Sequence, residues 1–372
     1  MTSRERVLAA LNRQPADRAP VFMWFHPDTA RRLAGRLEIP ARLVAEAMGN
    51  DVRQTWVSNN YAMEGVVHAR DGEEHLDWWG IRWRRQHGFN QIAGFPLAGA
   101  PREQVLAYDF PGERLEDLLA LMDPVVRDRG ESFLGCDVSP CVFEMYWRLR
   151  GMEDTLLDMA ADPELAGEMF RRSADFSIEL GGRACERFPL DWFWTGDDVA
   201  GQRGMLFSPA CWRALVRPHL QRVFAAGKLR GLPVAYHCCG ALRPIIPDLI
   251  EIGMDILNPV QSNCPGMDPL ELKREYGRHL TFMGGVDTQH LLPRGSAEQV
   301  RRATARLLEG MTGGGGGYIL AASHTISPET PDENIFAMYE AAGITREEIF
   351  DRAAALRSDP DIMQSGPKEI QL

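Results

Sequence analysis

The stretch LPVAYHCCG, residues 232–240, decides the fold prediction, because an apolar run of strand-forming residues ends abruptly in reactive polar ones. The amphipathic stretch LRPIIPDLIEIG (242–253) follows it and is typical of a short helix. The same order recurs downstream, where apolar runs at 255–259, 279–285 and 317–323 each precede a helical pattern. Apolar strands that alternate with helices predict a parallel sheet whose faces are covered.

The N-terminal half contributes four more strand candidates, which bring the total to eight. They are the runs at 19–25, 51–57, 132–138 and 190–196. Eight parallel strands, most of them followed by a helix, predict a closed (β/α)8 TIM barrel. An open doubly wound sheet is the alternative, but no GxGxxG sequence follows the first strand to favour it.

Signals for helix starts agree with this phasing. Ser296 with Gln299 matches a capping box, in which each side chain bonds the backbone N–H of the other residue, and so does Thr330 with Glu333. Pro209 stands just inside the helix predicted after residue 208, where its missing N–H does no harm.

We interpret residues 1–355 as a single barrel domain and 356–372 as a C-terminal tail. Residues 58–131 hold no clear strand–helix unit and are predicted to be an insertion at the barrel rim, after strand two. Within them, 72–86 is typical of a tryptophan-rich hairpin and 101–110 of a loop. Such an insertion either shapes a substrate pocket or subunit contact, or simply covers the rim.

Composition and charge exclude several classes of protein. The 372 residues are 45% hydrophobic and 25% charged, as in an ordinary globular enzyme. A net charge of −11 without a strong basic run argues against nucleic-acid binding, and no apolar run is long enough for a membrane span. The N-terminus has no signal-peptide pattern, so we expect a cytoplasmic protein whose seven cysteines are reduced thiols.

His237 and Cys239 form the sharpest candidate site. Residues i and i+2 of a strand point to the same face, and imidazole nitrogen and thiolate sulfur are both good zinc ligands. His324, after the last strand, is the third ligand we expect across the barrel mouth. Other third ligands remain open: Asp197, Asp198 or Cys264. The non-metal alternative is a small buried cysteine beside a hydrogen-bonded histidine.

Two aspartates are candidates for acid–base work at the same mouth. Asp198 follows strand four, and Asp287 follows strand seven in the sequence GGVDTQ. The alternative is that an aspartate after a strand caps a turn or helix, and we favour this role for Asp197. Candidate substrate contacts also occupy strand ends or the loops after them: His26, Gln202, Asn258 and Gln261.

The chain resembles the uroporphyrinogen decarboxylase superfamily. The resemblance covers nearly the whole length, and four runs follow the order and spacing of that family. These runs are LFSPACWRALVRPHLQRV (206–223), PVAYHCCG (233–240), GGVDTQHLLPRGSAEQV (284–300) and GYILAASHTISPETPDENI (317–335). The family fold is a (β/α)8 barrel, in agreement with the strand count.

The resemblance implies one of two activities. Decarboxylases of the family use no metal and bind a tetrapyrrole with an arginine-rich motif of the RQAGRY kind. Here the corresponding stretch is PVFMWFHPDTARRL (20–33), which lacks the arginine–glycine–arginine pattern. The other branch, cobalamin-dependent methyltransferases, carries an HxC pair on strand five and a later cysteine, which bind zinc and activate a thiol acceptor such as coenzyme M.

His237 and Cys239 match the pair of the methyltransferase branch. At the third position this chain has His324, where decarboxylases also carry a histidine. We therefore predict a zinc-dependent methyltransferase that moves a methyl group between a small methylated substrate or thiol and a corrinoid. No DxHxxG module occurs in the chain, so the corrinoid is expected on a separate protein or free.

Two other functions stay open from sequence alone. One is a metal-free decarboxylase or lyase of the uroporphyrinogen decarboxylase type. The other is a non-catalytic protein that binds a corrinoid or a tetrapyrrole. The oligomeric state is also open, with a homodimer among the alternatives.

Overall fold

The computed structural model describes residues 1–58 and 68–359. Seven parallel strands form its main sheet, and each pairs with the next along the chain. They are β1 (Val52–Trp56), β5 (Phe133–Asp137), β6 (Phe193–Gly196), β9 (Val234–His237), β10 (Ile256–Val260), β11 (Thr281–Val286) and β12 (Tyr318–Ala322). Apolar residues dominate these runs, and almost all of the residues from β5 onward are buried.

The segment 21–25 closes the barrel between β12 and β1, but it is not a regular strand. It makes only two isolated parallel bridges, from Val21 to Leu320 and from Phe25 to Ile326. On its other side the backbone N–H of Val21 donates to the Asp51 carboxylate (2.8 Å), and Asn50 bonds the backbone of Met23. The predicted first strand is therefore at the predicted place, with side chains replacing most of its ladder to β1.

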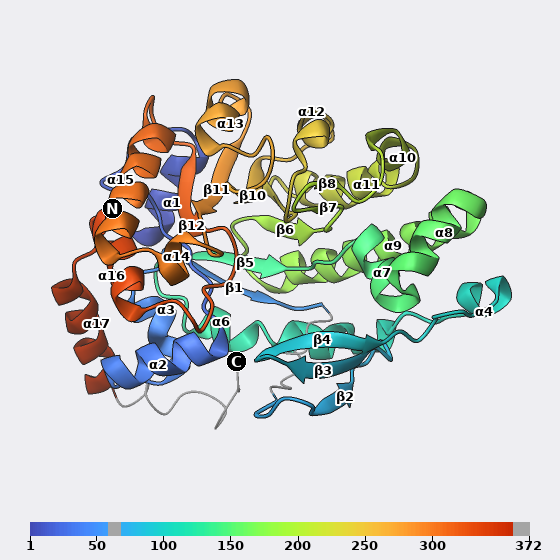
Figure 1. Ribbon diagram of the computed structural model, residues 1–372, viewed down its shortest axis with the longest axis horizontal. Helices are drawn as coiled ribbons and strands as arrows, with labels where there is room; N and C mark the ends of the chain where they lie inside the picture. The colour runs from blue at the N-terminus through green and yellow to red at the C-terminus, as the bar shows by residue number, and fades with distance from the viewer. Residues whose placement is uncertain (59–67, 360–372) are drawn as a thin grey trace.

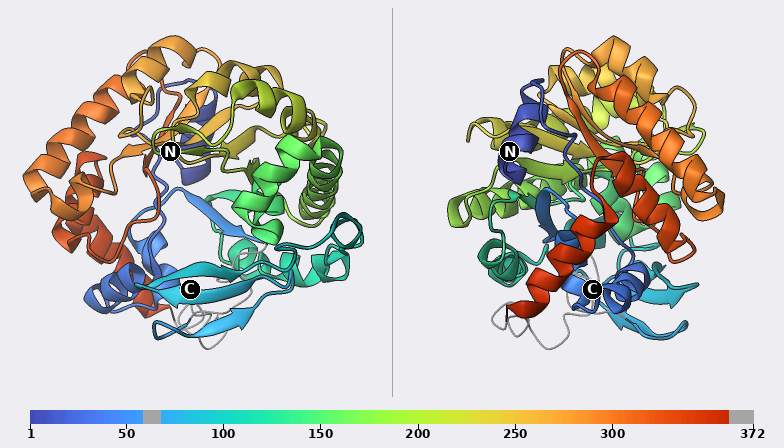
Figure 2. Two further views of the ribbon diagram at one scale, coloured as in Figure 1. Left: turned by 45° about the vertical axis from the view of Figure 1, so that its right-hand side comes forward. Right: turned by 90° about the vertical axis from the view of Figure 1, so that its left-hand side faces the viewer.

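Helices surround the strands on the outside, as Figures 1 and 2 show, and complete the predicted (β/α)8 TIM barrel. The longer ones are α1 (Ser3–Leu11), α2 (Pro27–Leu37), α7 (Phe143–Arg150), α8 (Met152–Ala161), α9 (Pro163–Arg187), α10 (Pro209–Leu215), α11 (Arg217–Lys228), α13 (Pro269–Tyr276), α15 (Ala297–Thr312), α16 (Asp332–Ala341) and α17 (Arg346–Ser358). Shorter helices are α3 (Val44–Ala47), α12 (Ile246–Glu251) and α14 (Leu291–Arg294). Among the described residues, none of the helices combines the length and apolar character needed to cross a membrane.

The helix starts confirm most of the predicted caps. Ser296 and Gln299 form the capping box of α15, and the Ser208 side chain caps α10, which begins at Pro209. The capping box predicted for Thr330 with Glu333 is wrong. Helix α16 begins at Asp332, so its N-cap residue is Pro331 and not Thr330. No side-chain hydrogen bond caps this helix.

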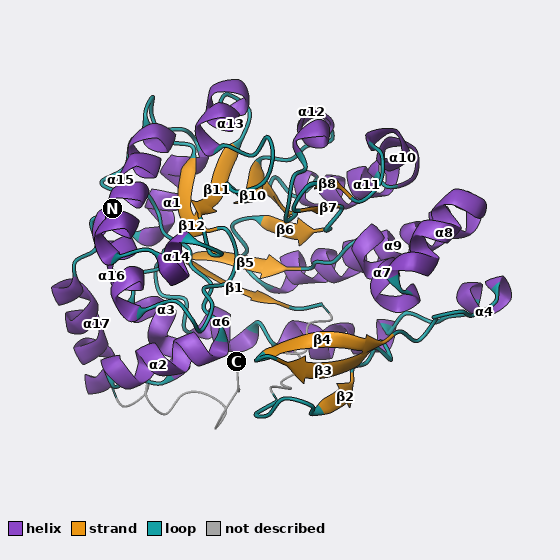
Figure 3. Ribbon diagram, in the orientation of Figure 1, coloured by secondary structure: helices purple, strands orange, loops and turns teal. Residues whose placement is uncertain are grey.

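Residues 68–110 pack beside the barrel rather than in its wall, and Figure 3 shows their strands apart from the parallel sheet. An antiparallel three-stranded sheet contains β2 (Glu74–Leu76), β3 (Arg82–Gln86) and β4 (Phe89–Gly94). The predicted hairpin is the β2–β3 pair. The predicted loop at 101–110 is wrong in part, because it contains α4 (Arg102–Leu106); α5 (Leu115–Ala120) and α6 (Asp123–Arg127) follow. Residues 112–127 instead join the helix layer, because α6 contacts β1, α5 contacts α9, and Leu118 and Leu119 belong to the core between strands and helices. That 58–131 is an insertion stays a prediction, and 59–67 lie outside the described residues.

Two separate cores follow from the alternation of side chains along each strand. One core lies between the strands and the helices. The other fills the barrel interior and consists mainly of large apolar side chains: Val7, Ala10, Phe22, Val52, Phe133, Trp192, Trp194, Ala235, Ile256, Met283, Ile319 and Ala321. The barrel is thus plugged below its mouth, and space for chemistry exists only at the carboxyl ends of the strands.

Candidate metal centre

Three predicted ligands meet at the barrel mouth. His237 is the last residue of β9, Cys239 lies two residues on, and His324 follows β12. Their ligand atoms all lie within 4.8 Å of one another, and His237 Nε2 is 3.5 Å from Cys239 Sγ. A tetrahedral zinc with bonds of about 2.1 Å to nitrogen and 2.3 Å to sulfur separates two such ligands by about 3.6 Å. The donor set and the His237–Cys239 spacing fit zinc, and the His324 ring lies within 4.8 Å of both other ligands.

Neighbouring strands hold the ligands in place. The Asn258 carboxamide oxygen lies 2.7 Å from His237 Nδ1, which leaves Nε2 toward Cys239. The backbone N–H of Cys239 donates to Asp198 Oδ1 (2.7 Å), and that of Gly240 donates to Gln261 Oε1 (2.8 Å). Outer contacts of this kind orient the ligands of metal sites.

Gly196 makes room for the His237 side chain. It is paired with His237 in the β6–β9 register. A Cβ atom at Gly196 would lie 2.9 Å from His237 Cβ and 3.1 Å from Ser139 Cβ. Such distances are too short for carbon atoms, so the glycine is needed for the close approach of the two strands.

The protein environment favours neutral ligands. Burial, together with the neighbouring His237, lowers the pKa of His324 to about 4, although its ring is exposed to the mouth. The unprotonated imidazole is the form that binds a metal. Burial, and next the Asp198 carboxylate, raises the pKa of the Cys239 thiol well above its ordinary value. A bound cation would reverse this effect, because a coordinating thiol loses its proton.

Two acids lie directly behind the ligands. Burial and then repulsion by Glu144 raise the pKa of Asp198 to about 6. Glu144, on α7, accepts the backbone N–H of Asp198 (2.9 Å) and pairs with Arg148 (2.6 Å). Asp198 therefore changes its charge near neutral pH, beside the candidate ligands, as an acid–base group would.

Asp197 has the structural role that the sequence favours. Its side chain is fully buried and accepts the backbone N–H groups of Val142, Phe143 and Glu144, at the start of α7. This cap ties the helix that carries Glu144 to the strand end beside the ligands.

Aromatic and acidic residues that the sequence analysis missed complete the mouth. The Trp24 ring is centred 5.7 Å from that of His237 and 6.5 Å from that of His324, and stacks against Trp56. Asp137, at the end of β5, is buried, and burial raises its pKa to about 8. Strand alternation was the signal: Trp56 and Asp137 lie an even number of residues from interior positions of β1 and β5.

The remaining predicted site residues do not join the three ligands. His26 caps α2 by accepting the Asp28 N–H on Nδ1, and its Nε2 lies 3.1 Å from the Gly88 carbonyl oxygen. Asp287 accepts the N–H groups of Gln289 and His290, which form the turn before α14.

Gln202 is exposed in the turn between β7 (Ala200–Gly201) and β8 (Gly204–Met205). Its Oε1 atom lies 3.6 Å from Cys264 Sγ. Neither Gln202 nor Cys264 belongs to the group of three ligands.

Comparison with known proteins identifies the family. The family model described as uroporphyrinogen decarboxylase (URO-D) matches residues 134–343, more than half of the chain. The chain belongs to the uroporphyrinogen decarboxylase family. The matched residues run from Leu134, the second residue of β5, past the end of β12 and include all three candidate metal ligands.

Individual relatives of the URO-D family are distant. A uroporphyrinogen decarboxylase from Thermus thermophilus is 34% identical over 132 residues, which are 34% of this chain and 35% of that protein. This match therefore spans only about a third of the relative's length. Another, from Anaeromyxobacter, is 23% identical over 90% of this chain and 97% of its own. The solved structure of a methyltransferase from Methanosarcina mazei has a TM-score of 0.70 at 18% identity, covering 92% of this chain and 98% of its own, and shares the fold.

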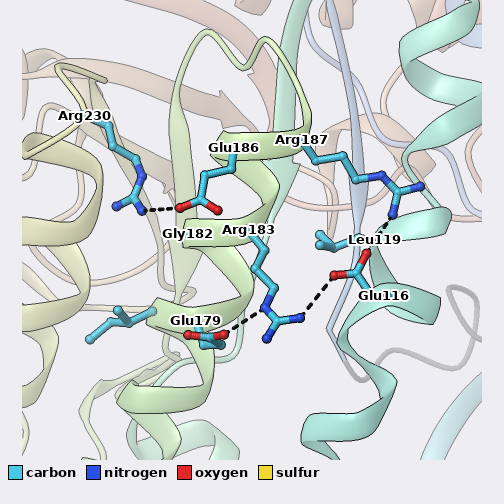
Figure 4. A pocket seen from close by; sticks show the side chains of 9 residues that line it. Glu116, Leu119, Glu179, Gly182, Arg183, Glu186, Arg187 and Arg230 are labelled. Atoms are coloured by element: carbon cyan, nitrogen blue, oxygen red, sulfur yellow. Dashed lines mark hydrogen bonds and ion pairs between the residues drawn. The ribbon is translucent and has the colours of Figure 1, made fainter.

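A cavity of about 660 Å³ on the outer surface of this URO-D family member is not part of the candidate centre. Figure 4 shows it between α9 and α5, lined by charged side chains. Arg183 pairs with Glu116 and Glu179, and Arg187 pairs with Glu116 as well. These arginines are engaged by acids of the protein itself, so the cavity offers no obvious charge for a ligand.

Proposed function

We propose that the protein is a zinc-dependent methyltransferase that moves a methyl group between a small methylated substrate or a thiol and a corrinoid. The corrinoid would arrive on a separate protein or free. The observation that carries the proposal is the convergence of His237, Cys239 and His324 within 4.8 Å at the barrel mouth. The Methanosarcina protein of the same fold is named a methyltransferase, which agrees with the proposal.

The three ligands would hold zinc with two neutral nitrogens and one thiolate, leaving a position for substrate. When bound, zinc supplies Lewis acidity toward a thiol sulfur or toward a methyl-bearing oxygen or nitrogen. A site with one thiolate is more Lewis acidic than a site with two, which favours oxygen or nitrogen substrates over thiols.

The chain's own residues would bind the substrate and move its proton. Asp198, with its pKa of about 6, is mostly ionised at neutral pH and would accept the proton that a thiol loses when it is methylated. In demethylation of a methyl-bearing oxygen or nitrogen, its protonated form would give a proton to the heteroatom that loses the methyl group. Trp24 and Trp56 provide an apolar wall beside the ligands for the methyl-bearing part of the substrate. Asp287 stabilises the turn after β11 by accepting the backbone N–H of Gln289.

A metal-free decarboxylase is the second candidate, and the names of the sequence relatives favour it. The mouth argues against a polyanionic tetrapyrrole, because its neighbours include the carboxyl groups of Asp198 and Glu144. In the 20–33 stretch, Arg31 and Arg32 are engaged by Asp28 and Asp332.

Metal analysis of the protein purified without chelators tests the proposal first. We expect about one zinc per chain, lost in His237→Ala and Cys239→Ala and retained in the control Cys211→Ala, whose sulfur lies on α10. The absorbance of methylcobalamin then reports methyl transfer to or from added thiols and methoxylated or N-methylated compounds. Absence of zinc, with no effect of His237→Ala on metal content, would overturn the proposal. Release of carbon dioxide from a porphyrinogen would support the decarboxylase instead.

A further inference from the structure

We infer that Asn258 is a positioning residue, which holds His237 as the tautomer that carries its proton on Nδ1. From the sequence alone, Asn258 is expected to contact substrate. In the structure its carboxamide oxygen lies 2.7 Å from His237 Nδ1, while His237 Nε2 faces Cys239. The consequence for metal binding rests on the proposed function, whereas the tautomer itself does not.

Strand register places the two side chains together. Asn258 on β10 is paired with His237 on β9, and both follow interior positions of their strands by two residues. The backbone carbonyl oxygen of Asn258 also accepts the Cys238 N–H (2.8 Å). This bond holds the backbone of β10 against the residue that follows His237. The carboxamide therefore has little freedom to turn away from the ring.

Burial makes this hydrogen bond selective. Asn258 is 1% exposed and His237 is 8% exposed, so water competes little for either group. A carboxamide oxygen can only accept, so it requires a proton on Nδ1 and leaves the Nε2 lone pair free. The other tautomer would put a proton on Nε2, toward Cys239. That nitrogen would then have no lone pair to offer a metal.

The neutral amide has a second consequence. Histidine ligands often donate to a carboxylate, which makes them more basic. Asn258 orients the ring without adding a negative charge. The centre therefore keeps the positive charge that a metal with two neutral ligands and one thiolate would carry.

The test uses Asn258→Leu, which removes the acceptor, and Asn258→Asp, which keeps one. The first readout is the nitrogen-15 NMR spectrum of histidine-labelled, metal-free protein, with His237 assigned by its loss in His237→Ala. The second is zinc affinity, measured by competition with a chromophoric chelator. Asn334→Leu is the matched control, because Asn334 is equally buried but donates to the carbonyls of Leu292 and Gly295.

We expect wild type and Asn258→Asp to show the Nδ1–H tautomer, and Asn258→Leu to lose that preference and about 10–100-fold in zinc affinity. Asn334→Leu should keep both properties. A His237 that carries its proton on Nε2 in wild type would overturn the inference, as would a folded Asn258→Leu with unchanged tautomer and affinity. If Asn258→Leu does not fold, wild type and Asn258→Asp still decide the tautomer. A correct tautomer in a protein that binds no zinc would sink the proposed function and leave the positioning role standing.

Discussion

The interior of the barrel and its mouth come from the same strands, only two residues apart. On β9, Ala235 belongs to the apolar plug and His237 to the candidate centre. On β10, Ile256 belongs to the plug and Asn258 contacts His237. The comparison teaches that one alternation supplies both stability and chemistry, and that the polar residues are confined to the level where the barrel opens.

The largest expected effect is a difference in unfolding free energy between substitutions in the apolar plug and substitutions at the mouth. Trp194 is fully buried in the plug, against Phe22, Trp24 and Trp192. Trp194→Ala should lower the free energy of unfolding by about 3–5 kcal/mol, because it removes a large buried ring and leaves a cavity. His237→Ala, one level above, should cost about 1–2 kcal/mol in the metal-free protein, because it removes a smaller ring and leaves the buried Asn258 carboxamide without that partner. Urea unfolding monitored by circular dichroism measures both, and equal losses would contradict the comparison.

A smaller effect concerns pH at the mouth. Burial raises the pKa of Asp137 to about 8, from an unfolded value of about 3.9. Between these values the folded state holds a proton that the unfolded state has lost, so wild type loses stability as pH rises. Asp137→Asn removes this titration and can still accept the backbone N–H of Ser139.

The stability of Asp137→Asn relative to wild type should therefore grow by about 1.4 kcal/mol per pH unit from pH 6 to pH 7, and by less as the pH approaches 8. Urea unfolding at pH 6, 7 and 8 gives the comparison. Stability curves that run parallel over this range would show that Asp137 is already ionised in the folded protein.

The smallest expected effect sharpens the geometry of the mouth. Gly196→Ala places a Cβ atom 2.9 Å from His237 Cβ, so the His237 side chain must move. We expect the free energy of unfolding to fall by about 1–2 kcal/mol and the affinity for zinc to decrease. Gly204→Ala is the control, since no atom lies within 4 Å of its added Cβ. Equal zinc retention in both variants would show that Gly196 does not position His237.

The sequence predicted the C-terminal strands closely, because each is a continuous apolar run bounded by polar residues and glycines. The proximity of His237, Cys239 and His324 could also be predicted, since residues after parallel strands share one end of a barrel. The place of Glu144 beside Asp198 could not be predicted from the sequence. This acid comes from a helix and meets Asp198 across 54 residues of chain, and no spacing rule connects the two.

The aromatic wall was missed for a different reason. Trp24 and Trp56 follow the same alternation as buried core residues, so their pattern alone does not separate packing from a substrate wall. The irregular first strand has a similar explanation. Its pattern is that of a strand, but its pairing with β1 depends on the side chains of Asn50 and Asp51, which no periodicity describes.

That seam between the segment 21–25 and β1 makes the barrel unequally robust to mutation. Backbone hydrogen bonds join most of the other neighbouring strands, and almost any residue can supply them. The β5–β6 pair shares only the Asp137–Trp194 register, and there the Asp191 carboxylate accepts the Leu134 N–H. At the seam, closure depends on the identity of Asp51, which is fully buried, bonds the Val21 N–H and is held by Arg6 and Arg18. A substitution of Asp51 therefore acts directly on the closure of the barrel at this seam, next to the wall that carries Trp24.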